Sequence, residues 1–151
     1  MSKLLILYYS RTGNTELMAR AVFEGAKEVQ EIDSKLKIDF EATPVDLGEA
    51  DALIVGMPTY HHDMTRSIKT LFEDTASKGV SLKDKIGATF GSYGWSGEAP
   101  NMILEIMEKQ FEMNVIQPSL RIKNKPNEKG LEECRNLGKK VAEKVKARVL
   151  K

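Results

Sequence analysis

The chain has 151 residues, of which 41% are hydrophobic and 30% charged, and its 23 basic and 22 acidic residues leave a net charge of +1. This length and composition are typical of one globular domain with its own core, so we expect a single monomeric domain over residues 1–151. The near-neutral charge excludes a whole-molecule field that would favour nucleic acid or an anionic membrane as partner.

The N-terminus and the cysteine content indicate where the protein works. The apolar run after Met1 is short and lacks a small-residue cleavage site, so we expect no signal peptide. No segment approaches the roughly 20 apolar residues of a membrane span. Cys134 is the one cysteine and cannot form an internal disulfide, which favours a cytoplasmic protein without dithiol chemistry.

Short apolar runs then alternate with amphipathic segments. Leu4–Tyr9 is continuously apolar and predicts a strand covered on both faces. The residues from Asn14 to about Gln30 have apolar side chains at helical spacing. Leu36–Ala42 alternates apolar with charged residues, which predicts an edge strand that Thr43 and Pro44 break.

The second half of the chain repeats this alternation without a linker or a sequence repeat. The expected elements are a strand at Ala52–Met57, a helix with Ile68, Leu71 and Phe72 that ends near Gly79, a strand at Lys85–Ser92, a helix with Met102, Ile103, Ile106 and Met107, a fifth strand at Val115 and Ile116, and a final helix from Leu131 to Val145.

Five strands alternating with helices predict a three-layer α/β sandwich, in which a parallel sheet has helices on both faces. Ligands of such sheets bind outside the carboxyl ends of the strands. The loops at those ends are Ser10–Thr15, Pro58–Met64 and Ser92–Glu98, and we expect the binding site there.

The first loop, SRTGNT, lies where a strand feeds a helix, so its N–H groups and the helix dipole favour an anion. Ser10, Thr12, Asn14 and Thr15 can donate hydrogen bonds to phosphate, and Gly13 lets the backbone approach closely. An ordinary N-cap needs only one such residue. The loop therefore favours a phosphate site.

The kind of phosphate follows from what this loop lacks. It has neither the lysine of a Walker loop nor the G-x-G-x-x-G of a dinucleotide fold. The end of the first strand also lacks the acidic residues that hold magnesium in response-regulator receivers. With Arg11 as its one charged residue, the loop suits a terminal phosphate monoester bound without a metal.

Aromatic residues characterise the other two loops. Tyr60 lies in the second loop and Tyr93 and Trp95 in the third, where they could enclose a flat ring; packing over the core is the simpler interpretation for any one of them alone. His61 and His62 are adjacent, so their side chains diverge and disfavour a metal site. We expect these histidines to line the pocket or to face solvent.

Together these loops resemble those of the short-chain flavodoxins, small FMN-binding electron carriers with strand order 2-1-3-4-5. SRTGNT is similar to the phosphate loop of that family, PTYH to its second flavin loop and GSYGWSGE to its third. The last two loops are most similar to the flavodoxin-like domain of flavodiiron (A-type) flavoproteins. Those proteins add a metallo-β-lactamase-like domain with a diiron centre, for which this chain, with two histidines, has no room.

The resemblance implies that the first loop holds the FMN phosphate, with Arg11 contributing its backbone N–H. Tyr60 and either Tyr93 or Trp95 would cover the two faces of the flavin. The residues implied to bind FMN are Ser10, Arg11, Thr12, Gly13, Asn14, Thr15, Pro58, Thr59, Tyr60, His61, Ser92, Tyr93, Gly94, Trp95 and Gly97. Asp63 and Glu98 are the acidic residues expected nearest the flavin. Both are also expected at helix starts, Asp63 as an N-cap and Glu98 as a first-turn charge.

The chain departs from many flavodoxins in two respects. His61 stands where many members have glycine, at a peptide that flips toward flavin N5; positive φ costs a non-glycine residue about 1–2 kcal/mol, so the flip is less favourable. Many members are also strongly acidic, whereas this chain is near neutral, so we expect partner docking to depend less on ionic strength.

The function that the resemblance implies is electron transfer rather than catalysis by the protein itself. FMN would carry electrons at low potential between a ferredoxin-like or reductase donor and an acceptor oxidoreductase. The main alternative is an FMN-dependent NAD(P)H:quinone reductase, which usually needs extra loops that this short chain lacks. A scaffold that has lost its flavin is disfavoured because all three loops are intact.

Overall fold

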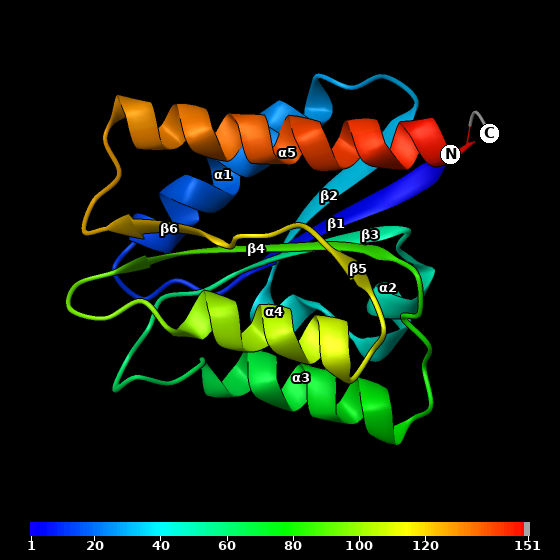
Figure 1. Cartoon of the computed structure of the whole chain (residues 1–151), viewed down its shortest axis with the longest axis horizontal. Helices are drawn as coiled ribbons and strands as arrows, with labels where there is room; N and C mark the ends of the chain where they lie inside the picture. The colour runs from blue at the N-terminus through cyan, green and yellow to red at the C-terminus, as the bar shows by residue number, and fades with distance from the viewer. Residues whose placement is uncertain (150–151) are drawn as a thin grey trace.

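The centre of the protein, which a computed structural model describes for residues 1–149, is a parallel β-sheet (Figure 1). Its strand order is β2-β1-β3-β4-β5, and β6 pairs with the carboxyl-terminal half of β4. This order confirms the predicted flavodoxin-like α/β fold. The elements are β1 (Ser2–Tyr8), α1 (Asn14–Lys27), β2 (Ile32–Ile38), α2 (Pro44–Glu49), β3 (Ala52–Gly56), α3 (Arg66–Ser77), β4 (Ile86–Tyr93), α4 (Ala99–Lys109), β5 (Asn114–Val115), β6 (Leu120–Lys123) and α5 (Glu128–Val149).

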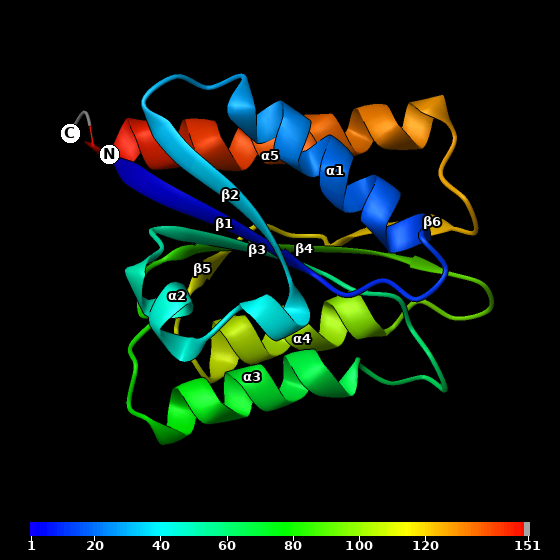
Figure 2. The same ribbon diagram turned by 180° about the vertical axis from the view of Figure 1, so that it is seen from behind.

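Helices cover both faces of the sheet, α1 and α5 one face and α3 and α4 the other (Figures 1 and 2). Successive side chains of a strand point to opposite faces. Leu4 and Ile6 of β1 accordingly join the core under α1 and α5, whereas Leu5 and Leu7 join the core under α3 and α4. The continuously apolar central strands predicted from the sequence therefore fill two cores at once.

The edge strand differs from the prediction. The alternation of Leu36–Ala42 predicts a strand there, but β2 ends at Ile38 and Asp39–Glu41 form a 3₁₀ turn. Phe40, expected on the buried face, is 80% exposed. The strand begins earlier because an edge strand with one wet face tolerates polar residues, and Asp33 and Ser34 pair with β1 despite their side chains.

Thr43 and Pro44, expected only to break a strand, begin the helix α2. The Thr43 hydroxyl accepts a hydrogen bond from the Asp46 N–H at 3.3 Å, and the Asp46 carboxylate accepts one from the Thr43 N–H at 2.9 Å. This reciprocal pair is a capping box, and proline is favourable at the first helical position. Burial alone would raise the pKa of Asp46, but the Thr43 N–H and the Lys37 ammonium hold that pKa below its usual value.

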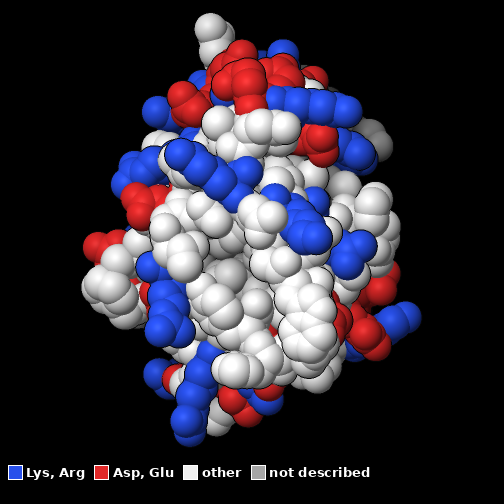
Figure 3. Space-filling model, turned by 90° about the vertical axis from the view of Figure 1, so that its left-hand side faces the viewer, with Lys and Arg blue, Asp and Glu red and all other residues white. Residues whose placement is uncertain are grey.

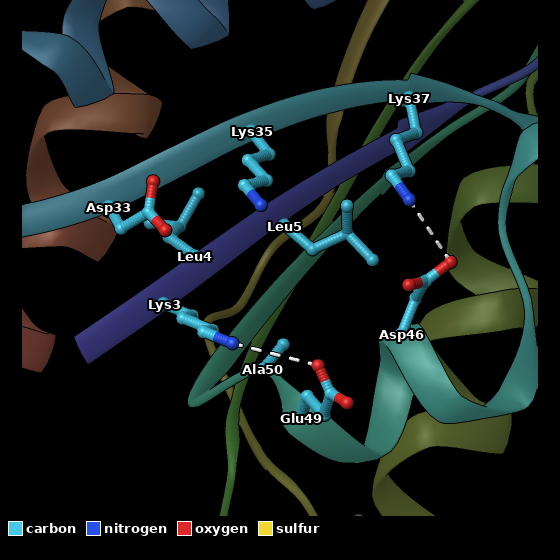
Figure 4. A pocket seen from close by; sticks show the side chains of 9 residues that line it. All are labelled: Lys3, Leu4, Leu5, Asp33, Lys35, Lys37, Asp46, Glu49 and Ala50. Atoms are coloured by element: carbon cyan, nitrogen blue, oxygen red, sulfur yellow. Dashed lines mark hydrogen bonds and ion pairs between the residues drawn. The ribbon is translucent and has the colours of Figure 1, made fainter. Parts of the chain in front are cut away.

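A small pocket of about 50 Å³ lies between α2 and the edge of the sheet (Figure 4). Across it, Lys3 Nζ is 3.5 Å from Glu49 Oε2, and Lys37 Nζ is 3.2 Å from Asp46 Oδ2. These pairs neutralise the charges of Lys3 and Lys37 and join α2 to the strands. None of the residues that line this pocket belongs to the three candidate loops.

The far edge of the sheet holds a strand that the sequence did not predict. The fifth strand is the short β5, and β6 continues this edge by pairing with Phe90–Tyr93 of β4. Because Arg121 and Lys123 face solvent, only Leu120 and Ile122 supply an apolar signal for β6. This strand places two basic side chains beside the third loop.

The longest helix, α5, packs along α1 (Figure 2). Cys134 lies on its buried side, where burial raises the pKa of the thiol to about 12. A thiol of that kind is a packing group and not a nucleophile. Within residues 1–149, no helix, α5 included, has both the length and the apolar character needed to cross a bilayer.

Candidate functional site

The three candidate loops meet at the carboxyl ends of β1, β3 and β4, which are neighbours in the sheet. The loops run through residues 9–13, 57–65 and 94–98. Figure 3 views this end of the molecule and shows an uncharged surface with a hollow near its centre. The topology thus brings together the segments that the sequence singled out.

The first loop folds around the side chain of Ser10. The Ser10 Oγ accepts hydrogen bonds from the N–H groups of Gly13 at 3.1 Å and Glu16 at 3.2 Å. Gly13 has φ of +96°, a conformation that suits glycine. The N–H groups of Asn14 and Thr15 belong to the first turn of α1, where helix geometry supplies no intrahelical acceptor. The loop therefore presents N–H donors at the positive end of a helix dipole.

Buried hydroxyl groups tie the loops to one another. Thr15 Oγ1 lies 2.7 Å from Ser92 Oγ, and both residues are buried, so this bond joins the start of α1 to the end of β4. Thr59 Oγ1 accepts a hydrogen bond from the Ala99 N–H at 2.9 Å, which joins the second loop to α4. The Thr15 side chain thus faces Ser92, whereas Thr12 is exposed on the loop.

The second loop makes a tight turn at its two histidines. His61 and His62 have φ of +51° and +61°, and the Asp63 N–H donates to the Tyr60 carbonyl at 3.0 Å. Two successive positive φ values are the requirement of a type I′ turn. His61 therefore has the positive φ that is costly for a non-glycine residue, and the turn stores about 1–2 kcal/mol of strain at each histidine.

The aromatic side chains of the site differ in exposure. Tyr60 is half-buried with the Arg11 guanidinium 5.9 Å from its ring centre, and burial, followed by the nearby Tyr9, raises the pKa of Tyr60. Tyr93 is also half-buried and packs against Gly97, where an added Cβ would come within 2.9 Å of the tyrosine ring. Trp95 is 86% exposed. Of the two candidate rings in the third loop, Trp95 is the more exposed.

His62 connects the second loop to the third, a contact that the sequence did not predict. Its Nδ1 lies 2.6 Å from Glu98 Oε2 and 3.1 Å from Ser96 Oγ, and its ring centre is 5.2 Å from that of Trp95. The hydrogen bonds from Ser96 and then from His62 hold the pKa of Glu98 below its usual value. We call His62, Trp95, Ser96 and Glu98 the loop latch.

The acidic residues expected at helix starts have other partners. Thr65 and not Asp63 is the N-cap residue of α3, and the Asp63 carboxylate accepts a hydrogen bond from the Met64 N–H at 2.7 Å. Glu98 does occupy the N-cap position of α4, but its side chain makes no capping bond there. No signal in the sequence links residues as far apart as His62 and Glu98, because their contact depends on the crossing of two loops.

The latch predicts a fluorescence change that needs no ligand. Asparagine tolerates positive φ, so His62→Asn keeps the turn but is too short to reach Glu98. We expect the emission of Trp95, the single tryptophan of the chain, to shift in this variant, and FMN affinity to fall about two- to fivefold, the size expected for an exposed pair. Fluorescence spectra and FMN titration measure the two effects.

The matched control for this prediction is His61→Asn, which has the same chemistry at the neighbouring residue of the turn. We expect its Trp95 emission to equal that of the unmodified protein. An identical shift in both variants would mean that the turn, and not the contact with Glu98, positions Trp95.

The contact between His62 and Glu98 should also depend on pH. Because the pKa of Glu98 is lowered, the contact should survive mild acidification and be lost only as the pH falls through the folded-state pKa of Glu98.

Comparison with known proteins gives consistent results. The sequence profile of the flavodoxin family matches residues 6–138. The type A flavoprotein fprA of Rhodobacter capsulatus is 37% identical over 150 residues, which are 96% of this chain but 34% of that protein. A flavodoxin of Aquifex aeolicus is 33% identical over 160 residues and is matched over 86% of its length.

A solved structure shows the same fold. A flavodoxin from the domain Archaea superposes with a TM-score of 0.88 and 40% identity, and the match covers 95% of this chain and 99% of that one. The chain thus matches the archaeal and Aquifex proteins over most of their length, whereas it spans only about a third of the Rhodobacter flavoprotein, 34% of its length.

Proposed function

Because the chain belongs to the flavodoxin family, whose members bind FMN and carry electrons, we propose that it is an FMN-dependent electron carrier that uses the three loops as its cofactor site. The observation that carries this proposal is the first loop. Its Ser10 hydroxyl accepts hydrogen bonds from the N–H groups of Gly13 in the loop and Glu16 in α1, while the first turn of α1 directs further N–H groups at one point, as a phosphate requires.

The residues of the loops fit the parts of FMN. The neutral donors Ser10, Thr12, Asn14 and the backbone around Gly13 and Thr15 would hold the phosphate. Tyr60 and Trp95 would cover the faces of the flavin, and we favour Trp95 over Tyr93 because Tyr93 packs against Gly97. The implied backbone contacts come from Arg11, Pro58, Thr59, His61, Ser92, Gly94 and Gly97.

The bound FMN would supply one- or two-electron transfer. The half-buried Tyr60 would exclude water from one flavin face. The hydrogen bond between Thr15 and Ser92 would hold the phosphate loop beside the third loop. The exposed Trp95 would leave the flavin edge close to the surface, where a partner can approach.

Redox proteins are the partners that the family implies. We propose a ferredoxin-like or reductase donor, an acceptor oxidoreductase and no nucleic acid, with the chain acting as a monomeric single domain. We also propose a cytoplasmic location, because the one cysteine is buried and proteins of oxidising compartments commonly rely on disulfides.

Titration of the purified protein with FMN tests the cofactor, because stacking on aromatic rings quenches flavin fluorescence. We expect quenching that saturates at one FMN per chain. The carrier function is tested with the FMN-loaded protein and NAD(P)H plus a quinone: we expect slow oxidation by the protein alone and rapid oxidation after a flavodoxin reductase is added. Rapid turnover without the reductase would show an enzyme instead of a carrier.

A further inference from the structure

Exposed basic residues border the proposed flavin site of this near-neutral chain. Figure 3 shows Lys and Arg side chains around much of the uncharged hollow. Five exposed basic residues lie here, which we call the basic rim: Arg11 in the first loop, Arg66 at the start of α3, Arg121 and Lys123 in β6, and Lys125 just after β6. The three loops, β6 and residues 124–127 hold two acidic residues, Asp63 and Glu98, and the latter is paired with His62.

Contacts with the loops fix part of the rim. The Arg11 guanidinium lies 5.9 Å from the Tyr60 ring centre, and Arg121 Nη1 donates to the Gly97 carbonyl at 3.4 Å. Lys123 is in register with Tyr93 at the end of β4. These basic groups therefore border the hollow and do not lie elsewhere on the molecule.

The basic rim has no carboxylate partners within residues 1–149. Among the residues that the structure describes, none of the five forms an ion pair, whereas Lys3, Arg20, Lys37 and Arg135 each do. Of the other acidic residues near this end, Glu16 is paired with Arg20, and Asp39 and Glu41 follow β2 at the outer edge of the sheet. Unpaired charges of one sign around a cleft create a local potential that the net charge of the chain does not reveal.

An exposed aromatic side chain lies in the third loop, which the rim residue Arg121 contacts. Trp95 is 86% exposed. Protein interfaces typically place an aromatic anchor at the centre and polar groups at the rim. The structure thus combines an exposed tryptophan with basic side chains that contact the same loop, which is the composition of a protein docking surface.

We propose that the basic rim docks an acidic redox protein, one whose carboxylates surround its own redox centre. This inference rests on the proposed electron-carrier function and adds the chemistry of the partner. It also replaces the expectation of weak salt dependence, which relied on net charge alone. Long-range attraction between the rim and the carboxylates steers the two redox centres together, so the association rate falls as salt screens it.

The experiment measures electron transfer by stopped flow from the reduced, FMN-loaded protein. The acceptors are an acidic plant-type [2Fe–2S] ferredoxin and a basic c-type cytochrome, each at about 20 and 500 mM salt. We expect the rate with the ferredoxin to fall about tenfold or more over this range. The rate with the cytochrome is expected to rise or to stay constant.

Charge-reversal variants separate the effect of the basic rim on electron transfer from the effect of net charge. One variant changes Arg66, Lys123 and Lys125 to glutamate, and leaves the residues that contact the loops intact. The matched control changes Lys139, Lys140 and Lys144, which are exposed on α5. We expect the rim variant to slow transfer to the ferredoxin about tenfold at low salt, and the control to change it less than about twofold. Equal slowing in both variants overturns the proposal.

Two further measurements separate a failure of the docking proposal from a failure of the proposed electron-carrier function. FMN titration should give the same affinity for both variants; failure of all proteins to bind FMN would refute the proposed function and not the docking surface. Isothermal titration with oxidised ferredoxin should give tighter binding to the unmodified protein than to the rim variant. Rim-dependent binding of a single-stranded oligonucleotide, together with salt-independent transfer to the ferredoxin, would overturn the inference in favour of nucleic acid.

Discussion

Replacement of Gly138 by alanine is expected to lower the free energy of unfolding by about 2 kcal/mol or more, because α1 and α5 touch through their backbones at this point. A Cβ at Gly138 would lie 1.9 Å from the Val22 carbonyl oxygen, and a Cβ at Gly25 would lie 1.8 Å from the Arg135 carbonyl oxygen. No side-chain rotation relieves a clash with backbone. The helices must separate, and because the contact is with backbone we expect the cost to reach about 3 kcal/mol or more, the upper end of the usual range for overpacking.

Helix propensity works in the opposite direction but is too small to compensate. Alanine is about 1 kcal/mol more favourable than glycine within a helix, so the expected loss is a net value after this gain. Urea unfolding followed by circular dichroism measures it. For a chain of this length, each kcal/mol lowers the melting temperature by about 2–4 °C.

Gly130 offers the matched control, because it lies in the same helix and is also buried. An added Cβ there would meet the Cδ1 methyl of Ile122 at 2.9 Å, and a methyl at the end of a flexible side chain can move. We expect Gly130→Ala to change the stability by less than about 1 kcal/mol. If the two variants lost equal stability, close contact between α1 and α5 would not be the reason for glycine at position 138.

The elements of the fold that can be predicted from the sequence are those with a clear apolar pattern. The strands β1 and β3 were predictable because they are apolar on both faces, and α1 because its apolar side chains recur at helical spacing. The short α2 was hidden because Thr43 and Pro44 can end a strand or begin a helix, and only the reciprocal bonds between Thr43 and Asp46 decide. Distances between backbones, such as that at Gly138, leave no periodic signal at all.

The candidate site likewise has features that the sequence predicts and features that it does not. Its loops were predictable because topology alone brings the ends of neighbouring parallel strands together. The partners within the loops were not predictable. The sequence does not predict the hydrogen bond between the Thr15 and Ser92 hydroxyls, and the pairing of His62 with Glu98 depends on how two loops cross. Charge was the least readable feature, since a net value of +1 conceals the basic rim.

A carboxylate at position 12 is expected to abolish tight binding of FMN while it spares riboflavin. Thr12 is exposed on the first loop, and no other side chain depends on it, so Thr12→Asp should fold normally. In the proposed site its charge would lie next to the phosphate. Two like charges about 4 Å apart repel by about 4 kcal/mol near a protein surface, so we expect FMN affinity to fall at least a hundredfold.

The comparison of ligands isolates the phosphate from the flavin ring. Riboflavin lacks the phosphate, so its affinity for Thr12→Asp should equal its affinity for the unmodified protein; fluorescence quenching measures both ligands. Thr12→Asn is the matched control, because it has nearly the same shape as aspartate without the charge, and it should weaken FMN binding by no more than about tenfold, the effect of one hydrogen bond. Equal losses of FMN and riboflavin in Thr12→Asp would place the phosphate elsewhere. In that case the N–H groups at the start of α1 would serve only to begin the helix.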